Sequence, residues 1–118
     1  MFETDRTRRV AELIKRQLAM LIMRELNDSR INSVSVTGVT VSRDLKQSTV
    51  YVSTLDKTLE PRQIEQLLNR SSKYLRHLLS QQVDLKMTPK LVFEYDHSLQ
   101  RGVELTQLID KLNNNNAA

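Results

Sequence analysis

The sequence predicts an α+β domain in which helices pack on a three-stranded sheet. Apolar residues recur at helical spacing near the start, in the middle and near the end of the chain. Between these segments, three shorter runs alternate apolar and polar residues, as half-buried strands do. At 118 residues the chain is long enough for one domain with its own core. We place this domain at residues 1–112 and expect the asparagine-rich residues 113–118 to form a flexible tail.

The first helix is predicted from Thr4 or Asp5 to about Leu26. Either residue is a suitable N-cap, because its side-chain oxygen can accept a hydrogen bond from a free N–H of the first turn. Basic side chains lie opposite the apolar stripe, and the polar residues 27–32 predict a connecting loop. The stripe expected to be buried consists of Val10, Leu13, Ile14, Leu18 and Leu21, with Met20 as a further candidate.

Residues 34–41 and 48–55 predict two strands, and the short turn at 42–47 predicts that they pair as an antiparallel hairpin. In the first strand, the two valines before Gly38 share one parity and the two after it share the other. One extra residue at Thr37-Gly38 would bring all four valines to the same face. We therefore expect a β-bulge there.

Residues 61–82 separate apolar from charged residues more clearly than any other stretch, and Pro61 suits a first helical turn. Ser71 falls in the middle of the apolar face, where serine hydroxyls can bond to carbonyls and bend a helix. We expect two short helices or one kinked helix, with the break near residues 71–73. A straight helix with a small packing residue is the alternative, and the pattern alone does not separate the two. The apolar face carries Ile64, Leu67, Leu68, Leu75, Leu78 and Leu79.

A third strand is predicted at residues 91–95, and a last helix follows Gly102. The apolar stripe of this helix comprises Leu105, Leu108, Ile109 and Leu112. We expect the stripe to cover the sheet, and docking on a partner protein is the alternative.

The charge is uneven along the chain. Lys and Arg number 18 against 14 Asp and Glu, a net charge of +4. Residues 1–90 carry +6 and residues 91–118 carry −2. The basic part contains the amphipathic segment 61–82, whose charged face suits contacts with phosphates. The chain has no cysteine, no apolar run long enough to cross a bilayer and no signal-peptide pattern, so we expect a cytoplasmic protein that does not enter membranes.

The residues that carry chemistry in enzymes are sparse. Asp96, His97 and Ser98 are adjacent and cannot converge on one reacting atom as a catalytic triad does. Two distant histidines without cysteine predict no metal site, and two glycines form no nucleotide-binding loop. Phe93 and Tyr95 are better explained as core residues than as a base-stacking platform. We therefore expect no enzyme, no cofactor and no metal.

Several segments, spread over nearly the whole chain, resemble one protein family in their order and spacing. They are Arg8-Arg9-Val10 with Glu12-Leu13-Ile14, the runs 39–45, 50–53 and 75–79, and the run 89–98 with Gly102. Together they resemble the ribosome-binding factor A family.

The resemblance implies a KH-like domain of the second type, in the order helix, strand, strand, helix, kink, helix, strand, followed by a C-terminal helix. The Ala-x-Gly kink of the family corresponds to Ser71, Ser72 and Lys73. The resemblance also implies a monomeric, non-catalytic factor that binds the free small ribosomal subunit (30S), assists maturation of its precursor rRNA and matters most in the cold.

The residues expected to bind RNA are the cations of the amphipathic segment and those that the fold would bring beside them. They are Arg8, Arg9, Arg43, Lys46, Arg70, Lys73, Arg76, His77, Lys86 and Lys90. A solvated charged face is the competing interpretation. A protein-interaction adaptor that recruits assembly factors or ribosomal proteins through the last helix is the alternative function, and a nuclease is disfavoured because no acid–base or metal cluster is present.

Overall fold

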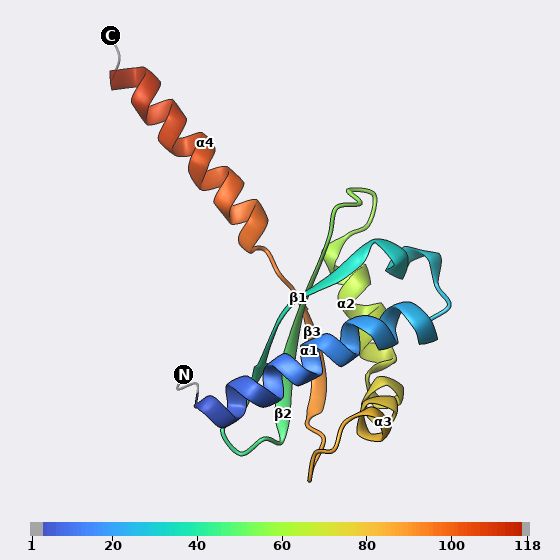
Figure 1. The fold of residues 1–118 in the computed structure, drawn as a ribbon. Coiled ribbons are helices and arrows are strands. Elements are labelled where there is room, and N and C mark those ends of the chain that lie inside the picture. Colours follow the sequence, from blue (N-terminus) through green and yellow to red (C-terminus); the bar gives the residue numbers. More distant parts are fainter. Residues whose placement is uncertain (1–3, 117–118) are drawn as a thin grey trace.

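The computed structural model describes residues 4–116 and confirms the predicted α+β class (Figure 1). In the sheet, β2 lies between β1, with which it pairs antiparallel, and β3, with which it pairs parallel. The elements are α1 (Asp5–Glu25), a 3-10 helix η1 (Ser29–Ser33), β1 (Val34–Val41), β2 (Gln47–Thr54), α2 (Pro61–Arg70), α3 (Ser72–Gln82), β3 (Lys90–Tyr95) and α4 (Ser98–Asn116). The loop predicted at residues 27–32 is therefore partly helical.

The core lies between one face of the sheet and the helices α1, α2 and α3. Val50 and Val52 of the central strand are fully buried and share one parity, so the helices cover a single face. Helix α1 packs against β1 and α3, whereas α2 and α3 pack against β3. Of the predicted α1 stripe, Ile14, Leu18 and Leu21 are buried, and Val10 and Leu13 are half-buried. The further candidate, Met20, is exposed because it lies beside the stripe rather than in it.

The predicted β-bulge is present in β1. The register with β2 shifts between Val36 and Gly38, which confirms the expectation from the valine pattern. The extra residue, Thr37, donates its hydroxyl to the carbonyl of Tyr51 (3.3 Å) and to Oδ2 of Asp96 (2.6 Å). The bulge thus also connects β1 to the end of β3.

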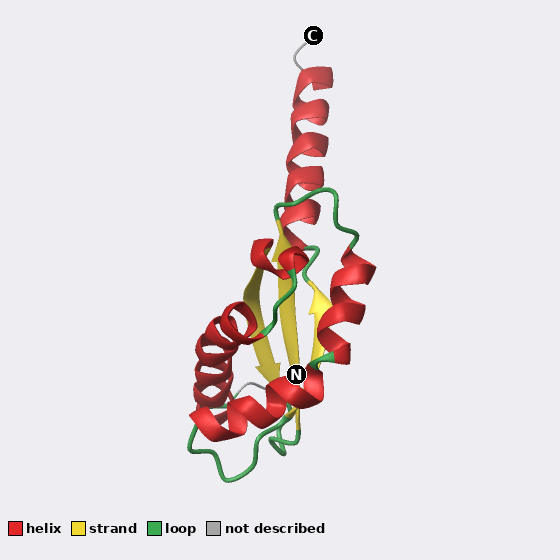
Figure 2. Ribbon diagram, turned by 90° about the vertical axis from the view of Figure 1, so that its right-hand side faces the viewer, coloured by secondary structure: helices red, strands yellow, loops and turns green. Residues whose placement is uncertain are grey.

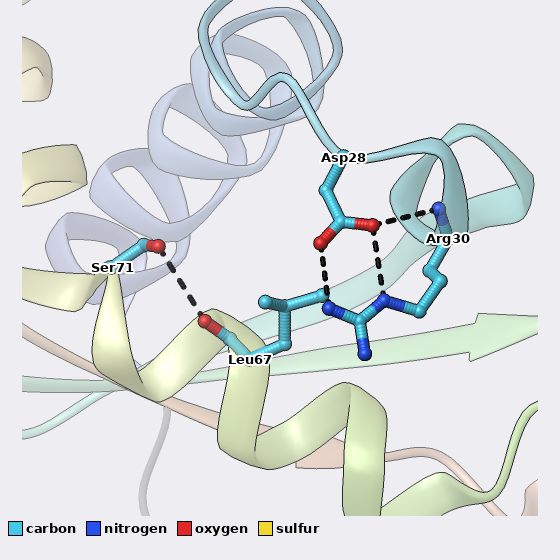
Figure 3. A network of polar contacts seen from close by, with 4 residues as sticks. All are labelled: Asp28, Arg30, Leu67 and Ser71. Carbon is cyan, nitrogen blue, oxygen red and sulfur yellow. Dashed lines mark hydrogen bonds and ion pairs between the residues drawn. The ribbon is translucent and has the colours of Figure 1, made fainter.

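The predicted break in the central helical segment lies at Ser71, between α2 and α3. Its backbone has φ −93° and ψ 3°, and its N–H donates to the carbonyl of Leu68 (3.0 Å). Its hydroxyl donates to the carbonyl of Leu67 (3.5 Å), as Figure 3 shows. The change of direction is made at negative φ, so the lysine at position 73 is compatible with the break although the family has glycine there.

The last helix begins at Ser98, four residues before the predicted start at Gly102. Asp96 accepts a hydrogen bond from the N–H of Ser98 (2.9 Å) and so caps this early start. A glycine inside a helix costs about 1 kcal/mol relative to alanine, which the helix tolerates here. Residues 113–116 are helical, Ala117 and Ala118 lie outside the described residues, and the flexibility of the tail stays a prediction.

The prediction that the last helix covers the sheet is wrong. Helix α4 extends away from the end of β3, and the molecule is 62 Å long as a result (Figures 1 and 2). The large apolar side chains of α4 remain about half exposed: Val103, Leu105, Leu108, Ile109 and Leu112 range from 48% to 57%. The sheet face opposite the helices carries Thr49, Tyr51 and Ser53 in the central strand, and the stripe of α4 does not lie on it (Figure 1).

The outer edge of β3 is closed by side chains of α2 rather than by another strand. Asn69 donates its Nδ2 to the carbonyl of Phe93 (3.0 Å) and accepts from the N–H of the same residue at Oδ1 (2.8 Å). Glu65 accepts from the N–H of Tyr95 (2.9 Å). An edge strand satisfied in this way offers fewer free groups for pairing with another chain.

Replacing Asn69 with alanine should leave the two backbone groups of Phe93 without a partner. We expect Asn69→Ala to lower the free energy of unfolding by about 1–3 kcal/mol. The control is Gln66→Ala, an exposed position of the same helix, which should stay within about 0.5 kcal/mol of the parent protein. Urea denaturation measures both, and equal stabilities of the two variants would contradict the edge-closing role.

The Asp96 carboxylate provides a pH test of the link between the bulge and α4. Hydrogen bonds from Thr37 first, and then from Ser98, lower its pKa from 3.8 to about 2. Because these bonds favour the charged form, their contribution to stability is complete above pH 3.8 and is lost as the pH falls towards 2.

We expect Thr37→Val to raise the pKa of Asp96 towards 3.8, as measured by NMR titration of its carboxyl carbon. Thr40→Val, in the same strand, should leave that pKa near 2. A pKa of Asp96 that does not respond to Thr37→Val would show that the Thr37 hydroxyl is not its main cause.

Candidate nucleic-acid interface

Arg76 joins α3 to the loop that precedes β3. Its side chain is half-buried, and its Nε and Nη2 both donate to the carbonyl oxygen of Thr88, at 2.9 and 2.8 Å. A guanidinium that donates twice to one acceptor fixes the direction of the chain at that acceptor. The loop carrying Lys86 is therefore held beside α3.

Four of the predicted RNA-binding residues meet around one open hollow beside α3. Lys73, Arg76 and His77 reach it from the helix and Lys86 from the loop, and Ser80, Leu85 and Thr88 complete its lining. This α3 hollow has a volume of about 490 Å³. Lys73, His77 and Lys86 are exposed, and within residues 4–116 none of them forms an ion pair with a carboxylate. The arrangement suits an anionic ligand.

The turn between β1 and β2 adds more positive charge at the same end of the sheet. The N–H of Lys90 donates to the carbonyl of Lys46 (2.9 Å), so these two predicted residues are neighbours. Both side chains are exposed, as is Arg43 in the same turn. Asp44 lies among these cations, and hydrogen bonds from the Ser42 hydroxyl and then the Lys46 N–H hold the pKa of its carboxyl below its usual value. The surface is basic but also carries the negative charge of Asp44.

A second hollow lies where the start of α1 approaches this turn and the loop after α3. Its lining is Arg6, Val10, Asp44, Leu45, Leu85, Lys86 and Met87, and its volume is about 360 Å³. We call it the α1 hollow, and it shares Leu85 and Lys86 with the α3 hollow. The sequence analysis predicted Arg8 and Arg9, which are exposed on α1, but missed Arg6. Its spacing of four residues from the apolar Val10 was the signal that placed it on this side of the helix.

Arg70 does not join this cluster. Together with Arg62 and Asn69 it lines a separate open hollow of about 600 Å³ against Phe93, and this hollow also contains the carboxylate of Glu65. Of the three predicted kink residues, Ser71 and Ser72 are half-buried at the break, and only Lys73 reaches the basic surface.

The neighbouring residues Asp96 and His97 are engaged in contacts of their own. Asp96 accepts from Thr37 and Ser98, and the ring of His97 lies 5.0 Å from that of Tyr95. Within residues 4–116 no group of three or more His, Asp or Glu side chains is placed to hold a metal ion. No helix in that range is long and apolar enough to cross a membrane.

Comparisons with known proteins identify the family of this chain. Two relatives, both named ribosome-binding factor A, are from Nitrosococcus oceani (45% identical, covering 92% of this chain and 86% of that protein) and Coxiella burnetii (43% identical, 92% and 90%). The crystal structure of ribosome-binding factor A from Thermus thermophilus superposes with a TM-score of 0.65 at 26% identity, over 74% of this chain and 92% of that one.

A further structural match is to a factor in complex with the small ribosomal subunit. It is a homology model of the Thermus thermophilus factor fitted into a cryo-EM map of a 30S complex, with a TM-score of 0.63 at 28% identity, over 74% of this chain and 91% of that one. The sequence model of the ribosome-binding factor A family matches residues 6–109, which include the whole sheet and all the basic residues considered above. The chain therefore belongs to the ribosome-binding factor A family.

Proposed function

We propose that this protein binds the small ribosomal subunit through the basic end of its sheet and assists maturation of the precursor rRNA, without catalytic chemistry of its own. The observation that carries the proposal is the gathering of Lys73, Arg76, His77 and Lys86 around the α3 hollow. Lys46 and Lys90 extend the same surface. Membership of the family and the 30S complex of the Thermus thermophilus factor support the choice of target.

Such a surface acts by favouring one arrangement of the RNA. Lysine and arginine side chains contact phosphates without reading the sequence, so they fix the position of the protein on a folded RNA. A protein that binds one RNA conformation more tightly shifts the population towards it. RNA leaves wrong pairings slowly at low temperature, so the effect should matter most in the cold. The site of action in this proposal is the cytoplasm, where small subunits are assembled, and the protein acts there as a monomer.

A second candidate function is a protein-interaction adaptor that uses α4. The exposed stripe of Leu105, Leu108 and Ile109 favours it, because contiguous exposed apolar surface commonly marks a contact with another molecule. In this alternative the protein recruits other assembly factors or ribosomal proteins to the subunit.

Removal of two lysines from the basic surface tests the first function. We expect Lys73→Gln with Lys86→Gln to weaken small-subunit binding and to reduce the steepness of log K against log salt by about 2, since binding releases about one counterion fewer for each phosphate contact that is lost. The matched control is Lys57→Gln with Lys111→Gln, two exposed lysines elsewhere in the chain. Equal affinities and slopes for the two pairs would argue against the basic surface and favour the adaptor.

Arg76 should differ from its neighbours because it holds the loop as well as carrying a charge. We expect Arg76→Ala to lower the free energy of unfolding by about 1–3 kcal/mol, because the Thr88 carbonyl loses a charged donor. His77→Ala, one residue further along α3 and exposed, should change stability by less than about 0.5 kcal/mol. Thermal or urea unfolding measures both variants. A stable Arg76→Ala protein would assign Arg76 to the charged surface alone.

A further inference from the structure

The α1 hollow combines features that the charged surface around it does not explain. Its walls include Leu45, Leu85 and Met87, and the Met87 side chain is 50% exposed. Arg6 and Lys86 belong to the same lining. A surface that bound only phosphates would not need apolar side chains beside its cations.

The backbone at Leu45 strengthens this observation. Leu45 has φ 63°, and it is the one residue other than glycine with positive φ within residues 4–116. Leucine is unfavourable in this region, where glycine, asparagine and aspartate are usual. Its half-buried side chain packs against the core and faces the hollow together with Val10. The hairpin turn holds this backbone, because the N–H of Leu45 donates to the carbonyl of Ser42 (2.9 Å), and it thereby fixes the Leu45 side chain at the wall of the hollow.

The charges around the α1 hollow limit which chemical groups can bind inside it. Asp44 lines it and its carboxyl pKa is held below the usual value, so a negative charge stands at the wall. A phosphate would be repelled from the interior and attracted to Arg6 and Lys86. The group that fits inside is neutral, flat enough to lie on aliphatic side chains, and attached to a phosphate.

We propose that the α1 hollow receives the base of one unstacked nucleotide of the rRNA, an inference that rests on the proposed function. The base lies against Leu85 and Met87, and the adjoining phosphates lie at Arg6 and Lys86. Proteins that take up a base out of its stack hold it between aromatic or apolar side chains, and cations beside such a site hold the phosphate backbone. A volume of about 360 Å³ is enough for a base and part of its sugar. Lys86 lines both hollows, so the nucleotide is continuous with the RNA along the α3 hollow.

The test removes apolar surface without changing charge. Met87→Gln preserves the length of the side chain, and Met23→Gln is its control at the other end of α1, where Met23 is 66% exposed. Binding of the full chain to purified small subunits and to protein-free small-subunit rRNA is measured at several salt concentrations. We expect Met87→Gln to weaken both by about fivefold at every salt concentration, with the slope against log salt unchanged, and Met23→Gln to have no effect. Adding a short single-stranded RNA should also move the NMR signal of the Met87 methyl group by the ring current of the base, while that of Met23 stays in place.

Each contrary outcome has a separate meaning. If Met87→Gln binds as the parent protein does while Lys73→Gln with Lys86→Gln binds weakly, the nucleotide pocket is overturned and the proposed function stands. If neither change weakens binding, the proposed function fails as well. A loss with intact subunits but not with protein-free rRNA would mean that a ribosomal protein occupies the hollow, which also overturns the nucleotide.

Discussion

Two hydrogen bonds from the guanidinium of Arg76 to the carbonyl of Thr88 hold the α3–β3 loop, and the shape of the basic surface depends on this contact. The loop brings Lys86 beside Lys73 and His77 on one side and beside Arg6 on the other. Among the described residues, no other side-chain hydrogen bond joins α3 to the loop that carries Lys86. One arginine thus contributes charge and also positions the charges of others, two effects that a change to alanine removes together.

The same end of the molecule combines three kinds of surface that act differently on an RNA. Exposed lysines attract phosphates over a distance that depends on salt. The Asp44 carboxylate keeps phosphates out of one place, and the apolar walls of the α1 hollow offer a contact that salt does not weaken. A surface of lysines alone would bind any RNA helix. With the nucleotide pocket that we propose, the apolar hollow and the Asp44 carboxylate would restrict binding to RNA that presents an unstacked base at the right distance from its backbone.

Local pattern was enough to predict most of the fold. The phase change of the valines predicted the bulge beside Gly38, and Ser71 in an apolar face predicted the break between α2 and α3. The path of α4 depended on the connection after β3, which a helical period does not encode. The residues of the candidate site divide in the same way, into those that local pattern predicts and those that it does not. Exposed cations such as Lys73 were predictable, whereas the contacts of Arg76 with Thr88 and of Asn69 with Phe93 join residues 12 and 24 positions apart, and only the tertiary structure shows them.

The basic surface and helix α4 lie at opposite ends of β3, and this separation determines how the two can act together. The basic surface lies where β3 begins at Lys90, and α4 leaves where β3 ends (Figure 1). Helix α4 buries none of its described apolar side chains in the domain. Its helicity therefore rests on local propensity and on the cap from Asp96. Isolated helices of this length are only marginally stable in water. A partner that covered the Leu105 and Leu108 stripe would supply the missing burial. The Thr37–Asp96 contact ties the start of α4 to β1. A partner of α4 would therefore meet the helix in an orientation that is fixed relative to the basic surface. Binding at α4 and binding at the basic surface would use different residues, so each would strengthen the other.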